Sequence, residues 1–391
     1  MSKWQPMTIG QFLSLQRGYD LTEDEREVGN IPVVGAAGQN GFHNKALASA
    51  PGIVVGRCGG SFGQVYFAKE DFWPHNTAMF VTDFKGNDPY FAYYLLKNID
   101  FSRLNSGSAQ PSLNRNYVYP IKITVPKPPE QRKVAAVLSA LDTKIDCNNR
   151  INAELEAMAK TLYDYWFVQF DFPDANGKPY KSSGGKMIYN TTLKREIPAG
   201  WKDSNILAVA DLLGGGTPTK KKPEYWSGDI PFFTPTDADG TIFKFSTADY
   251  ITDEGLKGSS TKLFGKHTVF ITARGSVGRL VLAGVDMAMN QSCYALRAKS
   301  GISHTYLFFL AKELIHHLQV KSSGSVFDSI VSNDIELTNL AIPKNDAVEK
   351  FAATVEPAFE KIANNTKENQ HLTHLRDWLL PMLMNGQVRV A

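Results

Sequence analysis

The sequence predicts an α+β protein: two tandem globular α/β domains separated by two long helices, which pack as an antiparallel coiled coil with pseudo-two-fold symmetry. Three observations predict this fold. A stretch in mid-chain has the hydrophobic spacing of a coiled-coil helix, and a second stretch near the C-terminus matches it. The segments before these stretches share a series of short motifs in the same order, so the chain is a tandem duplication with two copies.

Composition indicates a folded protein of two or three domains. The chain has 391 residues, of which 43% are hydrophobic and 21% charged, and this balance excludes disorder. The net charge of +3 neither supports nor opposes nucleic-acid binding. Cys58, Cys147 and Cys293 lie far apart without a metal-ligand spacing, which suits a reducing compartment. We find no signal-peptide core and no run of 18 apolar residues, and therefore expect a cytoplasmic protein that does not contact membranes.

The first domain is expected to cover residues 1–127. Short β-rich runs alternate there with turns of glycine, asparagine and proline, which predicts an irregular and largely antiparallel sheet. One helix is expected from Pro89 to Asn98, in the segment PYFAYYLLKN. The β-rich runs lie at 31–34, 52–55, 64–67, 78–81 and 121–125.

The first long helix is expected over residues 128–169. Neither glycine nor proline interrupts 130–167, and these 38 residues would form a rod of roughly 57 Å. Asn148 and Asn152 occupy seam positions, where they are either exposed to solvent or specify the pairing of the helix. Apolar or small residues recur in steps of four and three, as in a coiled-coil seam, at Val134, Leu138, Leu141, Ile145, Leu155, Ala159, Leu162 and Trp166.

A linker and a second domain follow. Residues 170–196 are rich in glycine, lysine, serine and proline without an apolar period, and are expected to form a linker or a loop laid over the surface. Residues 197–343 repeat the motifs of the first domain, which predicts the same fold. The repeats match 230–233 to 31–34, 270–278 to 53–63, 289–290 to 75–76, 323–325 to 106–108, and 340–343 to 123–126.

The second long helix is expected over residues 344–391. Shifting it back by 217 positions places Asn365 on Asn148 and Asn369 on Asn152. We therefore predict that the two helices pack on each other, antiparallel if their asparagines meet in a central layer. Pro357 predicts a bend, or a helix that begins properly only after it, since proline removes a backbone hydrogen bond.

The duplication itself indicates a class of function. Two related but different domains on an antiparallel helix pair present two different surfaces, much as dimeric DNA-binding proteins present two identical ones. Such a pair suits a DNA site of two different half-sites with an unread gap. A rod of roughly 57 Å corresponds to about one and a half turns of B-DNA at about 34 Å per turn.

Several sequence blocks, in this order, carry a family resemblance. They are IPVVGAAGQNGFHNKA, GIVVGRCGGSFGQVYF, WPHNTAMFV, SGSAQPSLN before VPKPPEQRKVAAVL, YDYWFVQFDFP, IPAGW, GGGTPTKKKPEYWSGDIPF and LLPMLMNGQV. Over essentially its whole length, the chain resembles the DNA-specificity subunit of type I restriction–modification systems.

The resemblance implies that each globular domain is a target recognition domain for one half of a split DNA site, and that the helices form the spacer. It implies three kinds of partner: double-stranded DNA, two methyltransferase subunits and, for restriction, translocase–nuclease subunits. It also implies that this chain binds no cofactor and catalyses no reaction, since the methyltransferase subunit would use S-adenosylmethionine to methylate adenine N6.

The residues agree with a binding module. The chain has no G-x-x-x-x-G-K-[ST] loop for ATP, and 87–90 lacks the second proline of an Asn/Asp-Pro-Pro-aromatic tetrad that holds a flipped base. His371 and His374 lie one helical turn apart without a third metal ligand near them in sequence. Two alternatives are a self-contained methyltransferase or nuclease with a diverged site, and a pseudo-dimeric scaffold that recognises protein or membrane. The missing loops oppose the first alternative, and basic loops oppose the second.

Residues that contact DNA are sought among Arg, Lys, Asn, Gln, Ser and Thr. Arg57 and Arg274 are predicted at equivalent positions, each at a strand end before glycines, and serve DNA contact or a fold-stabilising ion pair. Asn76 and Asn290 are likewise predicted to be equivalent, which favours a structural or phosphate role because the half-sites should differ.

Base-reading residues are expected where the two copies diverge, although each of them also suits a plain solvated loop. In the first domain these are Gln39, Asn40, His43, Asn44, Lys45, Ser106, Ser108 and Gln110. In the second domain they are Lys220, Lys221, Lys222, Thr236, Asp237, Ser323 and Ser325, with the three lysines interpreted as a phosphate patch.

Aromatic residues near the far ends of the two helices have two explanations. Tyr163, Tyr165, Trp166, Phe167 and Trp378 form either a surface that docks a partner subunit or knobs that pack between the helices.

Overall fold

The computed structural model describes residues 4–107, 111–321, 328–343 and 345–390. The chain folds into two compact units. The first unit comprises Met1–Ile145 and His371–Ala391, and the second comprises Asp146–Gln370. Each unit therefore contains one globular domain, the beginning of one long helix and the end of the other.

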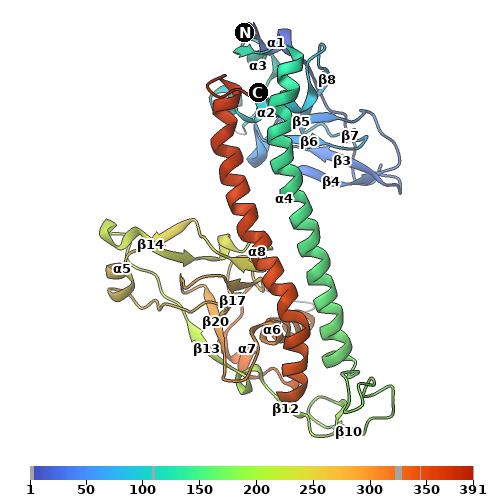
Figure 1. Ribbon diagram of the computed structural model, residues 1–391, viewed down its shortest axis with the longest axis vertical. Coiled ribbons are helices and arrows are strands. Elements are labelled where there is room, and N and C mark those ends of the chain that lie inside the picture. The colour runs from blue at the N-terminus through green and yellow to red at the C-terminus, as the bar shows by residue number, and fades with distance from the viewer. Residues whose placement is uncertain (1–3, 108–110, 322–327, 344, 391) are drawn as a thin grey trace. The chain divides into compact units, whose positions relative to one another are not determined.

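A four-stranded antiparallel sheet forms the middle of the first unit (Figure 1). Its order is β2 (Ser14–Arg17), β8 (Ala78–Asp83), β5 (Gly52–Gly56), β6 (Val65–Ala68). A smaller sheet has the order β4 (Gly38–His43), β3 (Ile31–Gly35), β7 (Trp73–Pro74), and β1 (Gln5–Thr8) pairs with β9 (Lys122–Val125). The short helices are α1 (Ile9–Phe12), α2 (Pro89–Lys97) and α3 (Arg115–Val118).

Local sequence explains why these elements form where they do. Strand β5 is buried at all five positions, as expected for a central strand of glycine and β-branched residues. Helix α2 begins at Pro89, because the Asp88 side chain accepts a hydrogen bond from the Phe91 amide and caps the helix. The predicted helix at this place is confirmed.

The second unit repeats this strand order. Its larger sheet is β13 (Ala210–Gly214), β20 (Cys293–Ala298), β17 (Val269–Thr272), β18 (Leu280–Ala283), β15 (Phe243–Lys244). Its smaller sheet is β16 (Asp249–Ile251), β14 (Trp226–Phe233), β19 (Ala288–Met289), and β12 (Lys202–Ser204) pairs with β21 (Leu340–Ile342). The helices are α5 (Asp253–Lys257), α6 (His304–Lys321) and α7 (Ser332–Glu336).

The segment predicted as a linker, 170–196, contains ordered structure. Strand β10 (Met187–Asn190) forms a hairpin with β11 (Arg195–Pro198). The Phe172 ring stacks on Trp201, with centroids 5.2 Å apart. The segment therefore packs on the second unit through aromatic side chains, although it has no periodic pattern of apolar residues.

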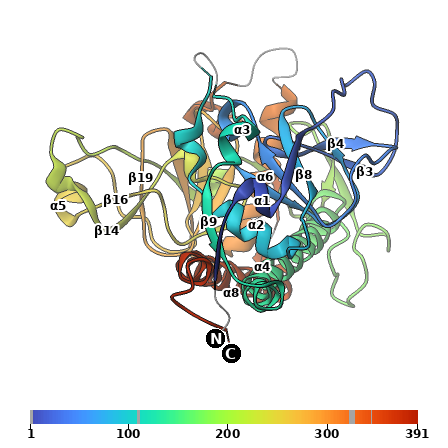
Figure 2. The ribbon, with the colours of Figure 1, turned by 90° about the horizontal axis from the view of Figure 1, so that it is seen from above.

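The two long helices are α4 (Pro128–Tyr163) and α8 (Asn345–Met384), and Figure 2 shows both nearly end-on. Helix α4 continues as a π-helical turn over Asp164–Val168. Helix α8 is continuous through Pro357, so the prediction that it begins only after this proline is wrong. Pro357 and Ala353, whose carbonyl loses its partner, are both exposed, and water can satisfy that carbonyl.

A layer of asparagines joins α4 to α8 within the second unit. The Asn148 side chain is buried and donates to Asn369 Oδ1 (2.9 Å) and to a Glu368 carboxylate oxygen (2.8 Å). Asn365, also buried, donates to Asn152 Oδ1 (2.9 Å). Higher numbers on one helix meet lower numbers on the other, which confirms antiparallel packing. The asparagines specify the pairing, and the alternative of simple exposure is wrong.

The two asparagine pairs are related by the duplication. Adding 217 to Asn148 gives Asn365, and subtracting 217 from Asn369 gives Asn152. The duplication therefore makes the contact Asn148–Asn369 equivalent to the contact Asn365–Asn152. The pseudo-two-fold axis of the helix pair passes through this layer.

Candidate nucleic-acid interface

The first unit has a polar hollow where β2 and β5 end and β8 begins. Its volume is about 600 Å³. Backbone atoms of neighbouring strand ends meet there, and loops rather than strands supply most of the lining. The charged and polar lining residues include Arg17, Asp20, Arg57, Ser106, Asn114 and Arg115.

A set of hydrogen bonds holds the predicted residues together in this hollow. The Arg57 amide donates to the Thr77 carbonyl (2.9 Å), and its guanidinium donates to the Asn76 carbonyl (3.0 Å). The Asn76 side-chain amide donates to the Asp20 carboxylate. The Leu113 amide donates to the Arg57 carbonyl (2.8 Å), which brings the loop that carries Ser106 onto the same opening.

A close backbone approach explains the glycine in each copy at this place. A Cβ atom on Gly18 would lie 2.2 Å from the His75 carbonyl oxygen. A Cβ atom on Gly215 would lie 2.2 Å from the Asn290 carbonyl oxygen. Such contacts are too short for any side chain, so the same glycine contact occurs in both units.

The backbone ladder matches the two units residue by residue. The His75 amide donates to the Val34 carbonyl (2.9 Å), and the Asn290 amide donates to the Phe233 carbonyl (3.0 Å). These contacts continue the parallel pairs β3–β7 and β14–β19. His75 is therefore the counterpart of Asn290, and the predicted equivalence of Asn76 with Asn290 is wrong.

His75 and Asn290 have the same local structural role, although they are different residue types. The Nδ1 atom of His75 accepts from the Thr77 amide (3.4 Å). The Oδ1 atom of Asn290 accepts from the Ser292 amide (3.0 Å). Each side chain caps the amide two residues further on, so Asn290 supports a turn.

The true counterpart of Asn76 is Gln291, the next residue along. Asn76 bonds to Asp20, and Gln291 accepts from the Thr217 hydroxyl. Asp20 and Thr217 each lie two residues after the closely packed glycine. Both units therefore present a side-chain amide tied to a polar side chain at the same place, with different residue types.

The two arginines are also displaced by one position. The Leu113 amide donates to the Arg57 carbonyl, whereas the Ile330 amide donates to the Ala273 carbonyl (2.9 Å). Arg57 thus corresponds to Ala273, and Arg274 is the next residue. The predicted equivalence of Arg57 and Arg274 is wrong, although Arg274 is exposed and directly follows the counterpart of Arg57.

A difference in loop length causes this displacement. The Gly63 amide donates to the Gly56 carbonyl (2.8 Å), and the Gly278 amide donates to the Thr272 carbonyl (2.8 Å). The loop that the second pair closes is one residue shorter. Aligning Arg57 with Arg274 would therefore shift the backbone hydrogen-bond register by one residue, which disagrees with the observed strand pairing.

Three predicted residues of the first unit lie on or after β4. Gln39 and Asn40 are exposed on the strand, and Lys45 is exposed beyond it. The Asn40 carbonyl accepts from the Arg26 guanidinium (2.8 Å). Among the described residues, no hydrogen bond or ion pair links these three side chains to the hollow.

Two residues predicted as base readers are buried instead. His43 packs edge-on against Trp73, with ring centroids 5.0 Å apart, and its Nδ1 accepts from the Glu27 amide. Asp237 caps the Thr234 amide (2.8 Å). Both side chains are buried and hydrogen-bonded within their own unit, so they are not placed to contact bases, and these two predictions are wrong.

The lysine patch of the second unit lies on aromatic rings. The Lys220 ammonium lies 5.7 Å from the Trp226 ring centroid, and the Lys222 ammonium lies 4.7 Å from that of Tyr225. A hydrogen bond to the Tyr225 hydroxyl raises the pKa of Lys222. Lys221 is exposed. The raised pKa favours the charged form of the Lys222 ammonium, which suits a phosphate contact.

Other predicted residues complete the comparison. Thr236 is exposed, and its hydroxyl lies 2.7 Å from that of Thr234. Pro235, beside Thr236, approaches Gly275 in the loop of Arg274. The predictions for Ser108, Gln110, Ser323 and Ser325 lie outside the described residues.

Sequence reasoning missed several lining residues of the hollow, and two residues at the matching place of the second unit. They are Arg17, Asp20, Asn114, Arg115, Thr217 and Gln291. The signal that could have found some of them is a glycine at or just after the end of β2 and β13, in QRGYD and LLGGGT. Nothing in sequence spacing alone says that these glycines pack on the same backbone.

Three of the five aromatic residues predicted near the helix ends are buried in the second unit, whereas Tyr165 is 36% exposed. Tyr163, Trp166 and Phe167 are at most 7% exposed. The Tyr163 ring stacks on Phe309 (5.4 Å), and its hydroxyl donates to Glu313 (2.7 Å). This burial contradicts the docking prediction for these three side chains. Trp378 is 59% exposed.

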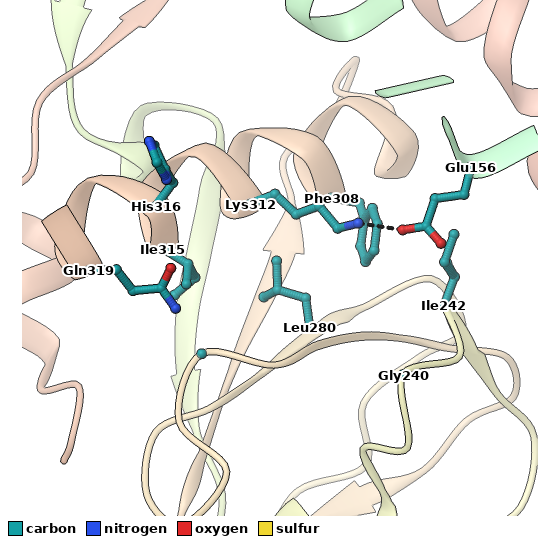
Figure 3. Close-up of a pocket in the computed structure, with 10 residues that line it drawn as sticks. Glu156, Gly240, Ile242, Leu280, Phe308, Lys312, Ile315, His316 and Gln319 are labelled. Atoms are coloured by element: carbon teal, nitrogen blue, oxygen red, sulfur yellow. Dashed lines mark hydrogen bonds and ion pairs between the residues drawn. The ribbon is translucent and has the colours of Figure 1, made fainter. Parts of the chain in front are cut away.

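A separate cavity of about 280 Å³ in the second unit is lined by α6, by residues in 240–242 and 278–280, and by Glu156 of α4 (Figure 3). The Lys312 ammonium pairs with the Glu156 carboxylate (2.5 Å) and lies 5.0 Å from the Phe308 ring centroid. No predicted DNA-contact residue lines this cavity. The ion pair holds the globular domain against α4.

Two classes of site are not found in the part of the chain that the structure describes. No three His, Cys, Asp or Glu side chains gather there as metal ligands. No helix there is long and apolar enough to cross a membrane.

The family model described as "Type I restriction modification DNA specificity domain" matches residues 1–157 and 198–374. The chain belongs to this family. Two named specificity subunits are similar to it. The type I restriction enzyme MjaIX specificity subunit of Methanocaldococcus jannaschii is 27% identical over 310 residues, covering 77% of this chain and 69% of the relative. The HindI specificity subunit of Haemophilus influenzae is 22% identical over 327 residues, covering 71% of each.

The fold agrees with a solved structure of the same kind. The S subunit of a type I restriction–modification system from M. genitalium matches with a TM-score of 0.58 at 17% identity, covering 98% of this chain and 96% of that chain. The specificity subunit described here is thus a non-catalytic component that recognises DNA sequence and acts with other subunits of its system.

Proposed function

We propose that the chain reads a split DNA site, one half with each globular domain, and holds two adenine-N6 methyltransferase subunits that use S-adenosylmethionine. The domains are 1–127 and 197–343, joined by the spacer helices 128–169 and 344–391 and by the segment 170–196. The observation that carries this proposal is the backbone frame present in both units, which has the same hydrogen bonds and glycine contacts and carries different side chains. A repeated frame with divergent lining suits two different half-sites.

The lining of the first hollow has the chemistry that DNA requires. Arg17, Arg57 and Arg115 supply guanidinium groups, which bind phosphate or the paired acceptors of guanine. Asn114 supplies a shorter donor for phosphate oxygens, whereas the Ser106 hydroxyl already donates to the Ser112 carbonyl (2.8 Å). A concave surface of this kind admits the edge of a duplex.

The asparagine layer supports the role of α4 and α8 as a spacer. Buried polar pairs penalise any shift in helix register, because a shifted asparagine would lose its partner in an apolar seam. A fixed register suits a gap of constant length between two half-sites.

Exposed apolar faces on the two long helices support docking of two methyltransferase copies. On α8 of the first unit, Leu375 and Trp378 are 42% and 59% exposed. On α4 of the second unit, Met158 is 56% exposed, and it lies 217 positions before Leu375. Large exposed side chains at matching places on both copies suit two copies of one partner.

Further partners follow from the same proposal. Translocase–nuclease subunits would join the methyltransferase complex for restriction. Such a complex acts on cellular DNA, so we place it in the cytoplasm.

A map of modified bases tests the proposal. Genomic DNA from cells that express the chain with its methyltransferase subunit is compared with DNA from cells that express the methyltransferase subunit alone. We expect a new N6-methyladenine motif of two parts with a fixed unread gap. No new motif from a stable complex would refute the proposal.

A further inference from the structure

We infer that Asn76 and Gln291 are the equivalent base-reading residues of the two domains, and that each recognises an adenine. The inference rests on the proposed function, since it names residues that would read the two half-sites. It arises from the match in backbone hydrogen bonds between the two units. An alignment by residue type alone pairs the wrong residues.

Independent contacts place the two amides at one structural position. The residues just before them, His75 and Asn290, donate to the strand ends Val34 and Phe233 in the same way. The residue just after Asn76, Thr77, accepts from the Arg57 amide (2.9 Å). The residue just after Gln291, Ser292, accepts from the Ala273 and Arg274 amides (2.8 and 3.2 Å). Contacts before and after the amides therefore agree.

The Asn76 and Gln291 side chains are at least partly exposed to solvent, whereas His75 Nδ1 and Asn290 Oδ1 are each already hydrogen-bonded to a backbone amide. Asn76 is half-buried, and Gln291 is exposed. Asp20, the partner of Asn76, lines the hollow directly. An arginine is close in each unit: the Arg57 guanidinium holds the Asn76 carbonyl, and the Arg274 amide donates to Ser292.

The hydrogen-bond partners orient the amides for a purine. The Asp20 carboxylate takes one N–H of Asn76, and a side-chain amide has two N–H groups and a carbonyl oxygen. The Thr217 hydroxyl donates to the Gln291 oxygen, which has a second lone pair. Among the described residues, each amide thus keeps an N–H and an oxygen acceptor for a ligand. One donor and one acceptor on an amide match N7 and the N6 amino group of adenine in the major groove.

The neighbouring turn residues provide matched controls. Asn290 and Gln291 are adjacent polar residues of similar chemistry, but Asn290 Oδ1 is used by the Ser292 amide. Asn290→Ala should lower the melting temperature and leave the recognised motif unchanged. Gln291→Ala should leave the melting temperature unchanged and relax one base position.

The experiment maps N6-methyladenine in cells that express the full chain, as wild type or variant, with its methyltransferase subunit. We expect Asn76→Ala to relax one adenine of one half-site, lowering discrimination there by roughly 5- to 150-fold. Gln291→Ala should do the same in the other half-site. In each variant, the untouched half-site is the internal control, and thermal unfolding of the purified complex reports whether the variant folds.

Several outcomes would overturn the inference. One is a split wild-type motif that neither variant changes, which refutes the reading residues while the proposed function stands. Another is complete loss of methylation by a variant with wild-type melting temperature, because a lost base contact relaxes a motif rather than abolishing it. Relaxation by Asn290→Ala in place of Gln291→Ala would also overturn it. A wild-type complex without a split motif would refute the proposed function itself.

Discussion

The two ends of the long helices pack into equivalent places with different chemistry. In the second unit, the end of α4 buries Tyr163, Trp166 and Phe167 among the rings of Tyr306 and Phe351. In the first unit, the end of α8 buries aliphatic residues 217 positions later: Leu380, Leu383 and Met384. One junction is aromatic and the other aliphatic, although both bury the same helix face.

The beginnings of the helices differ as well. Gln131 of α4 is fully buried and bonds to the Asp88 amide, the Asn87 side chain and the Pro126 carbonyl. Its counterpart 217 positions later, Val348, is buried in an apolar contact. A duplicated frame therefore tolerates different interiors, provided that each copy satisfies its own buried polar groups.

The aromatic junction should be the more sensitive of the two. We expect Phe167→Ala to destabilise the chain by about 3–5 kcal/mol, since it removes a buried ring. Met384→Ala should cost less, near the lower end of about 2–5 kcal/mol. Denaturant unfolding of both variants measures the difference, with Trp378→Ala as an exposed control within about 0.5 kcal/mol. Equal losses for Phe167 and Met384 would remove the distinction between the junctions.

Acid should weaken the second unit. His304 stacks on His267 with ring centroids 3.9 Å apart, and burial lowers the pKa of His304 to about 4 from its usual 6.5. Lys266 opposes protonation of the pair, and Glu356, 4.0 Å from His304, and Glu360 favour it. Between these pKa values the unfolded chain binds more protons, so stability is present above pH 6.5 and is lost as the pH falls towards 4.

The loss from His304 should reach about 3 kcal/mol at the acid end of that window. Thermal unfolding from pH 7 to pH 4 measures it. In the His304→Asn variant, stability should depend less on pH over this window. An identical pH dependence in wild type and variant would show that other groups control the acid sensitivity.

The asparagine layer permits a comparison of how much each of the two equivalent contacts contributes to the free energy of unfolding. Asn148→Ala removes bonds to both Glu368 and Asn369, and should cost about 2 kcal/mol. Asn365→Ala removes the bond to Asn152, and should cost about 1 kcal/mol. Denaturant unfolding of the two variants gives the difference. A larger loss for Asn365→Ala would contradict this order.

The smallest expected effect concerns the loop that follows β2 in the first unit and β13 in the second. This loop carries TEDERE in the first copy and PTKKKPE in the second. If Lys221 contacts one phosphate, Lys221→Ala should reduce the slope of log K against log salt by about 0.9. Titration of DNA into the complex at several salt concentrations measures the slope. Glu23→Ala, in the acidic loop, is the control and should not reduce it.

The partner surface is tested by Trp378→Ala in a binding measurement. Loss of this exposed ring should weaken methyltransferase binding by about 2 kcal/mol if it anchors the interface. Isothermal titration of the two purified proteins measures the affinity. Undiminished binding would exclude Trp378 as an anchor and direct attention to Met158.

The sequence by itself determined the duplication, both long helices and their antiparallel pairing. These features depend on local spacing and on asparagines that interrupt an apolar seam, and such patterns survive in one dimension. The sequence also indicated the hollow of the first domain through Arg57.

Only the tertiary structure decided which residues of the two copies are equivalent. Loop lengths differ between the strands, so Gln291 is the counterpart of Asn76, and Arg274 follows the counterpart of Arg57; backbone hydrogen bonds alone define this match. Tertiary packing also decided that Phe167 is buried whereas Trp378 is exposed, because burial depends on which segments cover a helix face. Residue type sets what a side chain can do, and the chain segments packed around it decide which of those roles it has.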